Sequence, residues 1–140
     1  MSTPKFSVII PCYNAEDWIE DCIYSVVEQE YKNFELIVVD NESTDRSVEI
    51  LRELQSSGCD FVLSSAPNIY PHCWDEAREV GFSMATGDYF HTMCADDYVH
   101  PEFLKNCAEL IRLSGQPLAI QSPIKGVKDE KHKIPYFAPM

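Results

Sequence analysis

The sequence predicts an α/β fold in which a mainly parallel sheet carries helices on both faces. Short runs of β-branched and aromatic residues alternate along the chain with segments whose apolar residues recur at helical spacing. This alternation is typical of βαβ units, whose parallel strands lie buried between helices. No repeat or linker interrupts the pattern, and 140 residues with 45% hydrophobic content suffice for one packed core.

Apolar runs of strand length mark five expected strands. The first, residues 6–11, ends at a proline, and the second, residues 34–39, is followed by Asp40. These runs are too short for a membrane span, which needs about 20 apolar residues. The remaining strands are expected at residues 61–63, 89–93 and 118–121.

Four helices are expected between and after these strands. In residues 16–29 the apolar positions fall on one face of a helix. Ser43 or Thr44 is expected to cap the next helix, which ends at Gly58. The two remaining helices are expected at residues 74–85 and from Pro101 onward.

The charge balance excludes one class of partner. With 11 Lys and Arg against 23 Asp and Glu, the formal net charge is −12. Binding to DNA or RNA depends largely on Lys and Arg that neutralise phosphates, so nucleic acid is not an expected partner. A phosphate ligand that is held through a metal ion remains compatible with the same charge.

The cysteines and the first residues indicate a cytoplasmic protein. The six cysteines form no Cys-x-x-Cys pair, which argues against a zinc site and against a dithiol redox motif. The N-terminus lacks the charged and apolar regions of a signal peptide. We therefore expect reduced, mostly buried thiols and a cytoplasmic location without a transmembrane segment, while peripheral membrane association stays open.

Polar residues follow three of the predicted strands, at residues 11–14, 40–43 and 96–97. In open parallel sheets the carboxyl ends of the strands form one edge, and ligands bind there. Asp96 and Asp97 are adjacent carboxylates, and Mg²⁺ or Mn²⁺ would compensate their mutual repulsion. The alternative is a solvated turn at the start of the following helix, where acidic residues are favoured.

Asp40 and Arg78 extend this candidate site. An acidic side chain after the second strand either binds a ribose hydroxyl or a base, or forms a turn into the next helix. Arg78 has acidic neighbours and serves either as a surface ion-pair residue or as a donor to a diphosphate. The chain has neither a Gly-x-Gly-x-x-Gly motif nor a P-loop, so a bound diphosphate needs a metal ion to neutralise it.

Several segments together resemble the N-terminal half of family 2 glycosyltransferases. The resemblance covers residues 5–122, and its specificity comes from the ordered set of segments rather than from any one of them. The segments are Phe6–Glu16, Glu35–Asp45, Glu76–Gly81, Ala85–Tyr89 and Ala95–Asp97.

This resemblance implies a GT-A fold that binds a nucleoside-diphosphate sugar together with Mg²⁺ or Mn²⁺. It further implies transfer of the sugar, with inversion, to a glycan, lipid or protein acceptor. In members of the family the loop after the first strand lines the nucleotide pocket, and the loop that corresponds to Asp96 and Asp97 contacts the donor and the metal ion. Carried over by position, the nucleotide-sugar contacts are Pro11, Tyr13, Asn14, Asp40, Asn41, Arg78 and Asp96, and the metal ligands are Asp97 and Asp96.

Three segments depart from the family pattern. The tetrapeptide 40–43 reads Asp-Asn-Glu-Ser where Asp-Asp-Gly-Ser is common, and Asn41 donates as well as accepts hydrogen bonds, which can alter base preference. Glu79 stands where an asparagine is often found. Cys94 occupies the first acidic position of the metal loop, so we expect weaker metal binding.

No residue of this chain is assigned as the catalytic base. Inverting members of the family use a carboxylate downstream of the metal loop, in the acceptor half. We therefore expect residues 1–122 to be the N-terminal, donor-binding part of the domain and residues 123–140 to be a tail or a truncated continuation. Two alternatives stay open, a non-catalytic nucleotide-sugar-binding module and a flavodoxin-like receiver domain that binds Mg²⁺ at its strand ends. The downstream acids, none of them assigned, are Glu102, Glu109, Asp129 and Glu130.

Overall fold

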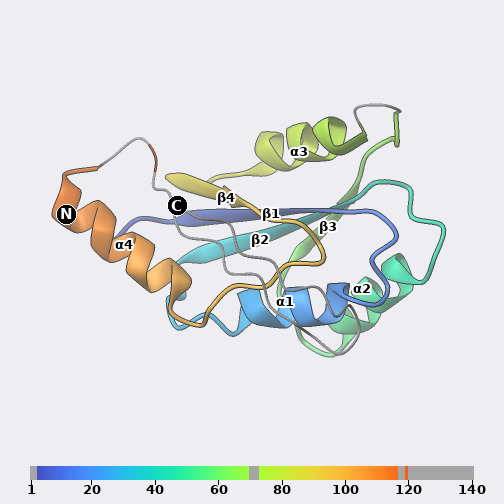
Figure 1. Ribbon diagram of the computed structural model, residues 1–140, viewed down its shortest axis with the longest axis horizontal. Coiled ribbons are helices and arrows are strands. Elements are labelled where there is room, and N and C mark those ends of the chain that lie inside the picture. The colour runs from blue at the N-terminus through green and yellow to red at the C-terminus, as the bar shows by residue number, and fades with distance from the viewer. Residues whose placement is uncertain (1–2, 70–72, 117–118, 120–140) are drawn as a thin grey trace, which may run out of the picture.

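The computed structural model of the chain describes residues 3–69, 73–116 and 119. Within these residues four strands form one parallel sheet in the order β3-β2-β1-β4 (Figure 1). The predicted parallel α/β sheet is therefore confirmed, whereas the strand expected at residues 118–121 falls on positions that, except for 119, lie outside the described residues. The strands are β1 (Phe6–Cys12), β2 (Phe34–Asp40), β3 (Val62–Ser65) and β4 (Tyr89–Thr92).

Helices cover both faces of the sheet, as predicted (Figure 1). Helices α1 and α2 lie together on one face, α4 packs into the same core, and α3 lies on the opposite face. None of the helices in residues 3–69 and 73–116 combines the length and the apolar character that a bilayer crossing demands. The helices are α1 (Ile19–Val27), α2 (Ser47–Ser56), α3 (Cys73–Met84) and α4 (Phe103–Ser114).

The two faces are filled by alternate residues of the central strands, because successive side chains of a strand point to opposite sides. Val8 and Ile10 of β1 belong to the core under α1, α2 and α4. Ile9, between them, belongs to the smaller core under α3, where it meets Ala77. Gly81 of α3 also lies against Ile9, and this close approach brings α3 tightly onto the sheet.

The start of α1 is later than predicted. Residues 16–18 form a turn, and the helix begins at Ile19 rather than at position 16. The N–H groups of Trp18 and Ile19 both donate to the carbonyl oxygen of Ala15. The apolar pattern correctly identified the buried face, since Cys22, Ile23 and Val26 are all fully buried, but it could not mark where the regular helix starts.

The expected cap of α2 is wrong. Neither Ser43 nor Thr44 caps this helix, which begins at Ser47 and whose N-cap residue, Arg46, makes no side-chain capping bond. The Ser43 hydroxyl donates instead to Asp40, and the Thr44 N–H donates to Asn14 in the loop after β1. These polar groups are used to join two loops, so the helix starts several residues later.

The order of the strands brings together the loops that carry the candidate site. Because β1 lies between β2 and β4 and all three are parallel, the loops that follow them emerge at the same edge of the sheet. The Met93 N–H continues the pairing of β4 with β1 by donating to the carbonyl oxygen of Ile9 at 3.1 Å. The polar residues after β4 therefore begin beside the loop after β1.

Candidate functional site

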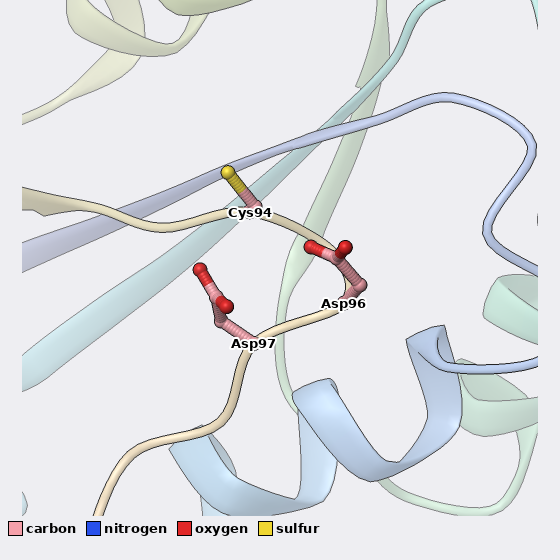
Figure 2. A group of neighbouring side chains, drawn as sticks. All are labelled: Cys94, Asp96 and Asp97. Atoms are coloured by element: carbon pink, nitrogen blue, oxygen red, sulfur yellow. The ribbon is translucent and has the colours of Figure 1, made fainter. Parts of the chain in front are cut away.

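The site is centred on residues 93–102, here called the acidic loop, which joins β4 to α4. Cys94 Sγ and one carboxylate oxygen each of Asp96 and Asp97 all lie within 4.8 Å of one another. Figure 2 shows the three side chains on the stretch of chain that follows β4. Asp96 and Asp97 are exposed and Cys94 is half-buried, so the structure brings the predicted metal-binding pair together at an accessible surface.

The acidic loop concentrates negative charge. Partial removal from water and the neighbouring charge of Asp96 raise the pKa of Asp97. Burial, Asp97 and Asp96 likewise raise the pKa of the Cys94 thiol, so Cys94 is a neutral thiol at physiological pH. Burial and the same carboxylates also raise the pKa of Cys22, on α1, whose thiol lies 3.6 Å from the carbonyl oxygen of Cys94. A cation at the loop would be attracted by this uncompensated charge.

Arg78 on α3 is a positively charged group that acts on the acidic loop. Its charge lowers the pKa of Cys94, against the larger effects of burial and of the carboxylates. Its Nη1 lies 3.9 Å from Asp75 Oδ1, one turn away, and 40% of the Arg78 side chain is exposed. Its Nε is buried and makes no hydrogen bond to the described residues. The guanidinium is thus paired only loosely and keeps donors for a further anion.

The loop after β1 is tied to the loop after β2. Asn14 takes a left-handed backbone conformation, with φ at 46°. Its backbone N–H donates to Ser43 Oγ at 3.0 Å, and its side-chain oxygen accepts from the Thr44 N–H at 2.7 Å. Tyr13 is 41% exposed, whereas Pro11 is buried within β1. Of these three predicted nucleotide contacts, Tyr13 presents its side chain most openly to solvent.

Asp40 forms the turn that the sequence left as one of its two alternatives. Its Oδ2 accepts from the Ser43 N–H at 3.0 Å, and its Oδ1 accepts from the Ser43 hydroxyl at 2.6 Å. Asp40 and Asn41 are both buried, and the Asn41 N–H donates to the carbonyl oxygen of Cys12 at 2.8 Å. Burial and the Asp40 charge raise the pKa of Cys12 to about 12.

Glu42 is a site residue whose role the sequence did not reveal. It has φ at 58°, a conformation that glycine adopts without cost, which explains why a glycine is common at this position in the pattern noted above. Its carboxylate accepts from the Asn68 N–H at 3.2 Å. The departure from glycine was the available signal, because a glycine in a short polar loop usually marks a positive φ.

Asp45 and Ser47 complete the hydrogen bonding between the two loops, and the sequence did not reveal their roles either. Burial alone would raise the pKa of Asp45, but hydrogen bonds from the Ser47 side chain and N–H and from the Glu16 N–H lower it. The fully buried Ser47 hydroxyl accepts from the Ala15 N–H at 2.8 Å. The loops after β1 and β2 therefore form one hydrogen-bonded unit.

Two cavities of the described residues lie away from the acidic loop, and the larger, of about 620 Å³, is lined by residues such as Phe34, at the start of β2, and Phe61. The other, of about 510 Å³, is lined by residues such as Pro4, Tyr31, Tyr89 and Ile111. Tyr89 begins β4, so this cavity lies at the amino end of that strand, whereas the acidic loop follows its carboxyl end. The candidate site is therefore formed by loops at the other end of the strands from these two cavities.

Comparisons with curated proteins identify relatives that are named as glycosyltransferases. An uncharacterized glycosyltransferase of Haemophilus influenzae is 37% identical over 100 residues, which is 71% of this chain and 39% of the relative. The amylovoran biosynthesis glycosyltransferase AmsB of Erwinia amylovora is 37% identical over 119 residues, which is 83% of this chain and 39% of the relative. The chain therefore spans about two fifths of the length of these relatives.

Solved structures give the same result. The crystal structure of Staphylococcus aureus TarS residues 1–349 superposes with a TM-score of 0.68 at 31% identity, covering 78% of this chain and 32% of that fragment. The same TarS fragment in complex with UDP-GlcNAc matches with a TM-score of 0.66 at 30% identity, covering 78% of this chain and 31% of the fragment. The mannosyltransferase PcManGT of Pyrobaculum calidifontis, in complex with GDP-Man and Mn²⁺, shares the fold with a TM-score of 0.71 at 24% identity over 94% of this chain and 38% of PcManGT.

The family assignment extends over nearly the whole chain. The model of the family described as glycosyl transferase family 2 matches residues 7–136. The match includes every candidate site residue, from Pro11 in β1 to Asp97 in the acidic loop. It also removes the flavodoxin-like receiver domain from the open alternatives. The resemblance seen in the sequence segments is confirmed, and the chain belongs to glycosyl transferase family 2.

Proposed function

We propose that this chain is the donor-binding part of a glycosyltransferase, and that it binds a nucleoside-diphosphate sugar together with Mg²⁺ or Mn²⁺. One observation carries the proposal. Cys94, Asp96 and Asp97 converge at the carboxyl end of the sheet, where ligands bind in open α/β folds. In a glycosyltransferase domain, carboxylates at this edge of the sheet support a diphosphate that is held through a cation.

The residues of the acidic loop fit a hard divalent cation. Asp96 and Asp97 supply two carboxylates, and Mg²⁺ and Mn²⁺ prefer one or two carboxylates completed by phosphate oxygens and water. Cys94 is held as a neutral thiol by its raised pKa, so we assign the cation to the two carboxylates alone. When bound, the ion would neutralise the diphosphate and act as a Lewis acid on the leaving group.

The nucleotide is proposed to lie between the acidic loop and the joined loops after β1 and β2. Tyr13 is exposed on the loop after β1, and Asn14 joins this loop to the loop after β2 through its bonds to Ser43 and Thr44. TarS, which is 30% identical where it matches, binds UDP-GlcNAc, and this supports a nucleotide-sugar donor here. The proposed donor contacts are Pro11, Tyr13, Asn14, Asp40, Asn41, Arg78 and Asp96.

Arg78 is proposed to contact the diphosphate. Its ion pair with Asp75 is long and solvent-exposed, so little free energy is lost when the guanidinium turns to a stronger anion. A planar guanidinium donates two parallel hydrogen bonds to phosphate oxygens. Arg78 and the cation would then neutralise the diphosphate from two sides.

Transfer of the sugar to an acceptor, with inversion, needs a general base that we place outside residues 3–69 and 73–116. The downstream acids in these ranges already have partners. Glu109 is paired with Arg112 at 2.6 Å and Glu102 with Lys105 at 3.6 Å. We accordingly propose that residues 1–122 form the donor part, with the acceptor site built by other residues. If no base completes the site, the chain is a nucleotide-sugar-binding module.

Calorimetric titration with UDP, GDP and CDP, with and without Mn²⁺, tests the proposal. We expect at least one nucleotide to bind, and only when Mn²⁺ is present. Asp97→Ala should abolish this binding, because it removes a metal ligand. The matched control is Asp60→Ala, which removes an exposed carboxylate just before β3, at the opposite edge of the sheet, and should leave binding unchanged. Absence of binding at millimolar nucleotide with Mn²⁺ would overturn the proposal.

A further inference from the structure

Gln29, just after α1, is a buried polar residue that contacts neither the proposed metal site nor the proposed nucleotide site. Its side chain is fully buried, which is costly for an amide unless its polar atoms are hydrogen-bonded. Every partner of its side-chain oxygen and nitrogen is a backbone group. Two of these partners lie more than 70 residues away, in and just after the acidic loop.

The Gln29 amide makes three hydrogen bonds of defined polarity. Its Nε2 donates to the carbonyl oxygens of Ser25 at 3.1 Å and His100 at 2.6 Å, and its Oε1 accepts from the Leu104 N–H at 2.9 Å. Rotating the amide by half a turn would place its oxygen against two carbonyl oxygens and its NH₂ group against an N–H. The side chain is therefore held in one orientation.

The bond to Leu104 serves as the missing cap of α4. The first residues of a helix have N–H groups with no partner inside the helix, and a side chain at the N-cap usually accepts one of them. Glu102 occupies the N-cap of α4 without making such a bond. Gln29 Oε1 takes over this role from another element, because Leu104 is the second residue of the helix.

Neighbouring bonds attach the same part of the acidic loop to the end of α1. The Val99 N–H donates to Ser25 Oγ at 3.2 Å, and the Glu30 N–H donates to the carbonyl oxygen of Pro101 at 2.9 Å. Together with the bonds of Gln29 to His100 and Leu104, these bonds hold positions 99–104. At its other end the loop is held by β4. Asp96 and Asp97 lie between the two attachments.

We propose that Gln29 is a positioning residue for the metal site: it fixes the downstream end of the acidic loop and so sets the spacing of Asp96 and Asp97 for a divalent cation. The inference rests on the proposed function, since it concerns the same cation site. Two carboxylates bind a cation tightly only when the protein holds them at the correct separation, and outer residues that orient metal ligands affect affinity strongly. Gln29 acts through the backbone of the loop, without touching the ion.

The test compares three variants of the 140-residue chain. Gln29→Met keeps the length and apolar stem of the side chain and removes all three hydrogen bonds. Gln29→Glu keeps the oxygen that accepts from Leu104 and loses the two donated bonds. The matched control is Gln55→Met. Gln55 Nε2 donates to the carbonyl oxygen of Phe61 at 2.9 Å, so this variant also breaks a bond from a glutamine side chain to a backbone carbonyl, but away from the acidic loop.

Two quantities are measured for each folded variant. The first is the dissociation constant for Mn²⁺, from the electron paramagnetic resonance signal of the free ion. The second is the hydrogen-exchange protection of the Val99 and Leu104 amides. We expect Gln29→Met to weaken Mn²⁺ binding about tenfold and to lose the protection, Gln29→Glu to lie between, and Gln55→Met to stay within about twofold of the unaltered chain.

The outcomes separate the inference from the function on which it rests. If the unaltered chain binds Mn²⁺ and Gln29→Met binds it equally well, the inference is wrong and the proposed function stands. If Gln29→Met and Gln55→Met weaken binding by the same factor, Gln29 has only a structural role and the inference is again wrong. If the unaltered chain fails to bind Mn²⁺, the proposed function fails first, and the role of Gln29 in metal binding fails with it.

Discussion

Gly81→Ala is expected to destabilise the fold, although alanine is the better helix former. A Cβ added at Gly81 would lie 2.4 Å from Cγ2 of Ile9, well short of the ~3.5 Å at which two carbon atoms normally meet. Ile9 is fully buried in β1, and its Cγ2 is bonded directly to Cβ, so it cannot swing away as the end of a long side chain would. Helix α3 must therefore move off the sheet.

The net effect follows from two opposing contributions. Replacing glycine by alanine inside a helix favours folding by about 1 kcal/mol. Overpacking a well-filled core costs about 1–3 kcal/mol, and a contact this short falls at the upper end of that range. We therefore expect a net loss of about 1–2 kcal/mol, which for a chain of this size lowers the melting temperature by roughly 3–8 °C.

Thermal and urea unfolding, followed by circular dichroism, measure this loss. Glu79→Ala, on the exposed side of α3, is the control and should change stability by less than about 0.5 kcal/mol. In an Ile9→Ala background the clashing methyl group is absent, so Gly81→Ala should become stabilising there. A Gly81→Ala variant that is as stable as the unaltered chain, or an effect of the same sign in both backgrounds, would refute the packing argument.

Three further outcomes are expected. Because the pKa of Asp97 is raised above its ordinary value of 3.8, ionisation of this carboxyl as the pH rises destabilises the folded chain. Asp97→Asn should therefore increase the urea midpoint at pH 7, while it removes Mn²⁺ binding. Ser43→Ala removes the hydroxyl that donates to the buried Asp40 carboxylate and accepts from the Asn14 N–H, and it should cost about 1–3 kcal/mol in urea unfolding. Ser83→Ala on α3 should cost less than about 0.5 kcal/mol. Cys12, fully buried and with its pKa raised to about 12, should resist iodoacetamide at pH 8 until the chain is unfolded, as mapped by mass spectrometry.

Features of the fold that depend on neighbours in the sequence were predictable. The four described strands and four helices all occur near their expected positions, because burial of alternate or helical faces leaves a regular apolar pattern. The cysteines are free as expected among the described residues, but only Cys12 and Cys22 are buried, and Cys59, Cys94 and Cys107 are half-buried. Full burial depends on which parts of the chain cover a thiol, and the local pattern does not contain that information.

Several of the errors and omissions share one physical cause, which is bonding between segments that are distant in the sequence. Serine is a residue type that often caps helices, yet the Ser43 hydroxyl donates to Asp40 and its oxygen accepts from the N–H of Asn14. Gln29 reads as an ordinary polar residue at a helix end, and its burial depends on a partner 75 positions later. Asp96 and Asp97 could be found because their contact is local, whereas the residues that hold them in place could not.

The hydrogen bonding between the loops after β1 and β2 has a consequence for redesign. Asn14 on one loop and Ser43 and Thr44 on the other exchange several hydrogen bonds, so the two loops keep their shapes only as a pair. A change of nucleotide preference by grafting a single loop from a relative would replace one partner of each of these bonds and leave the other loop without support. The transferable unit is the pair, exchanged together with the ends of the strands that carry them.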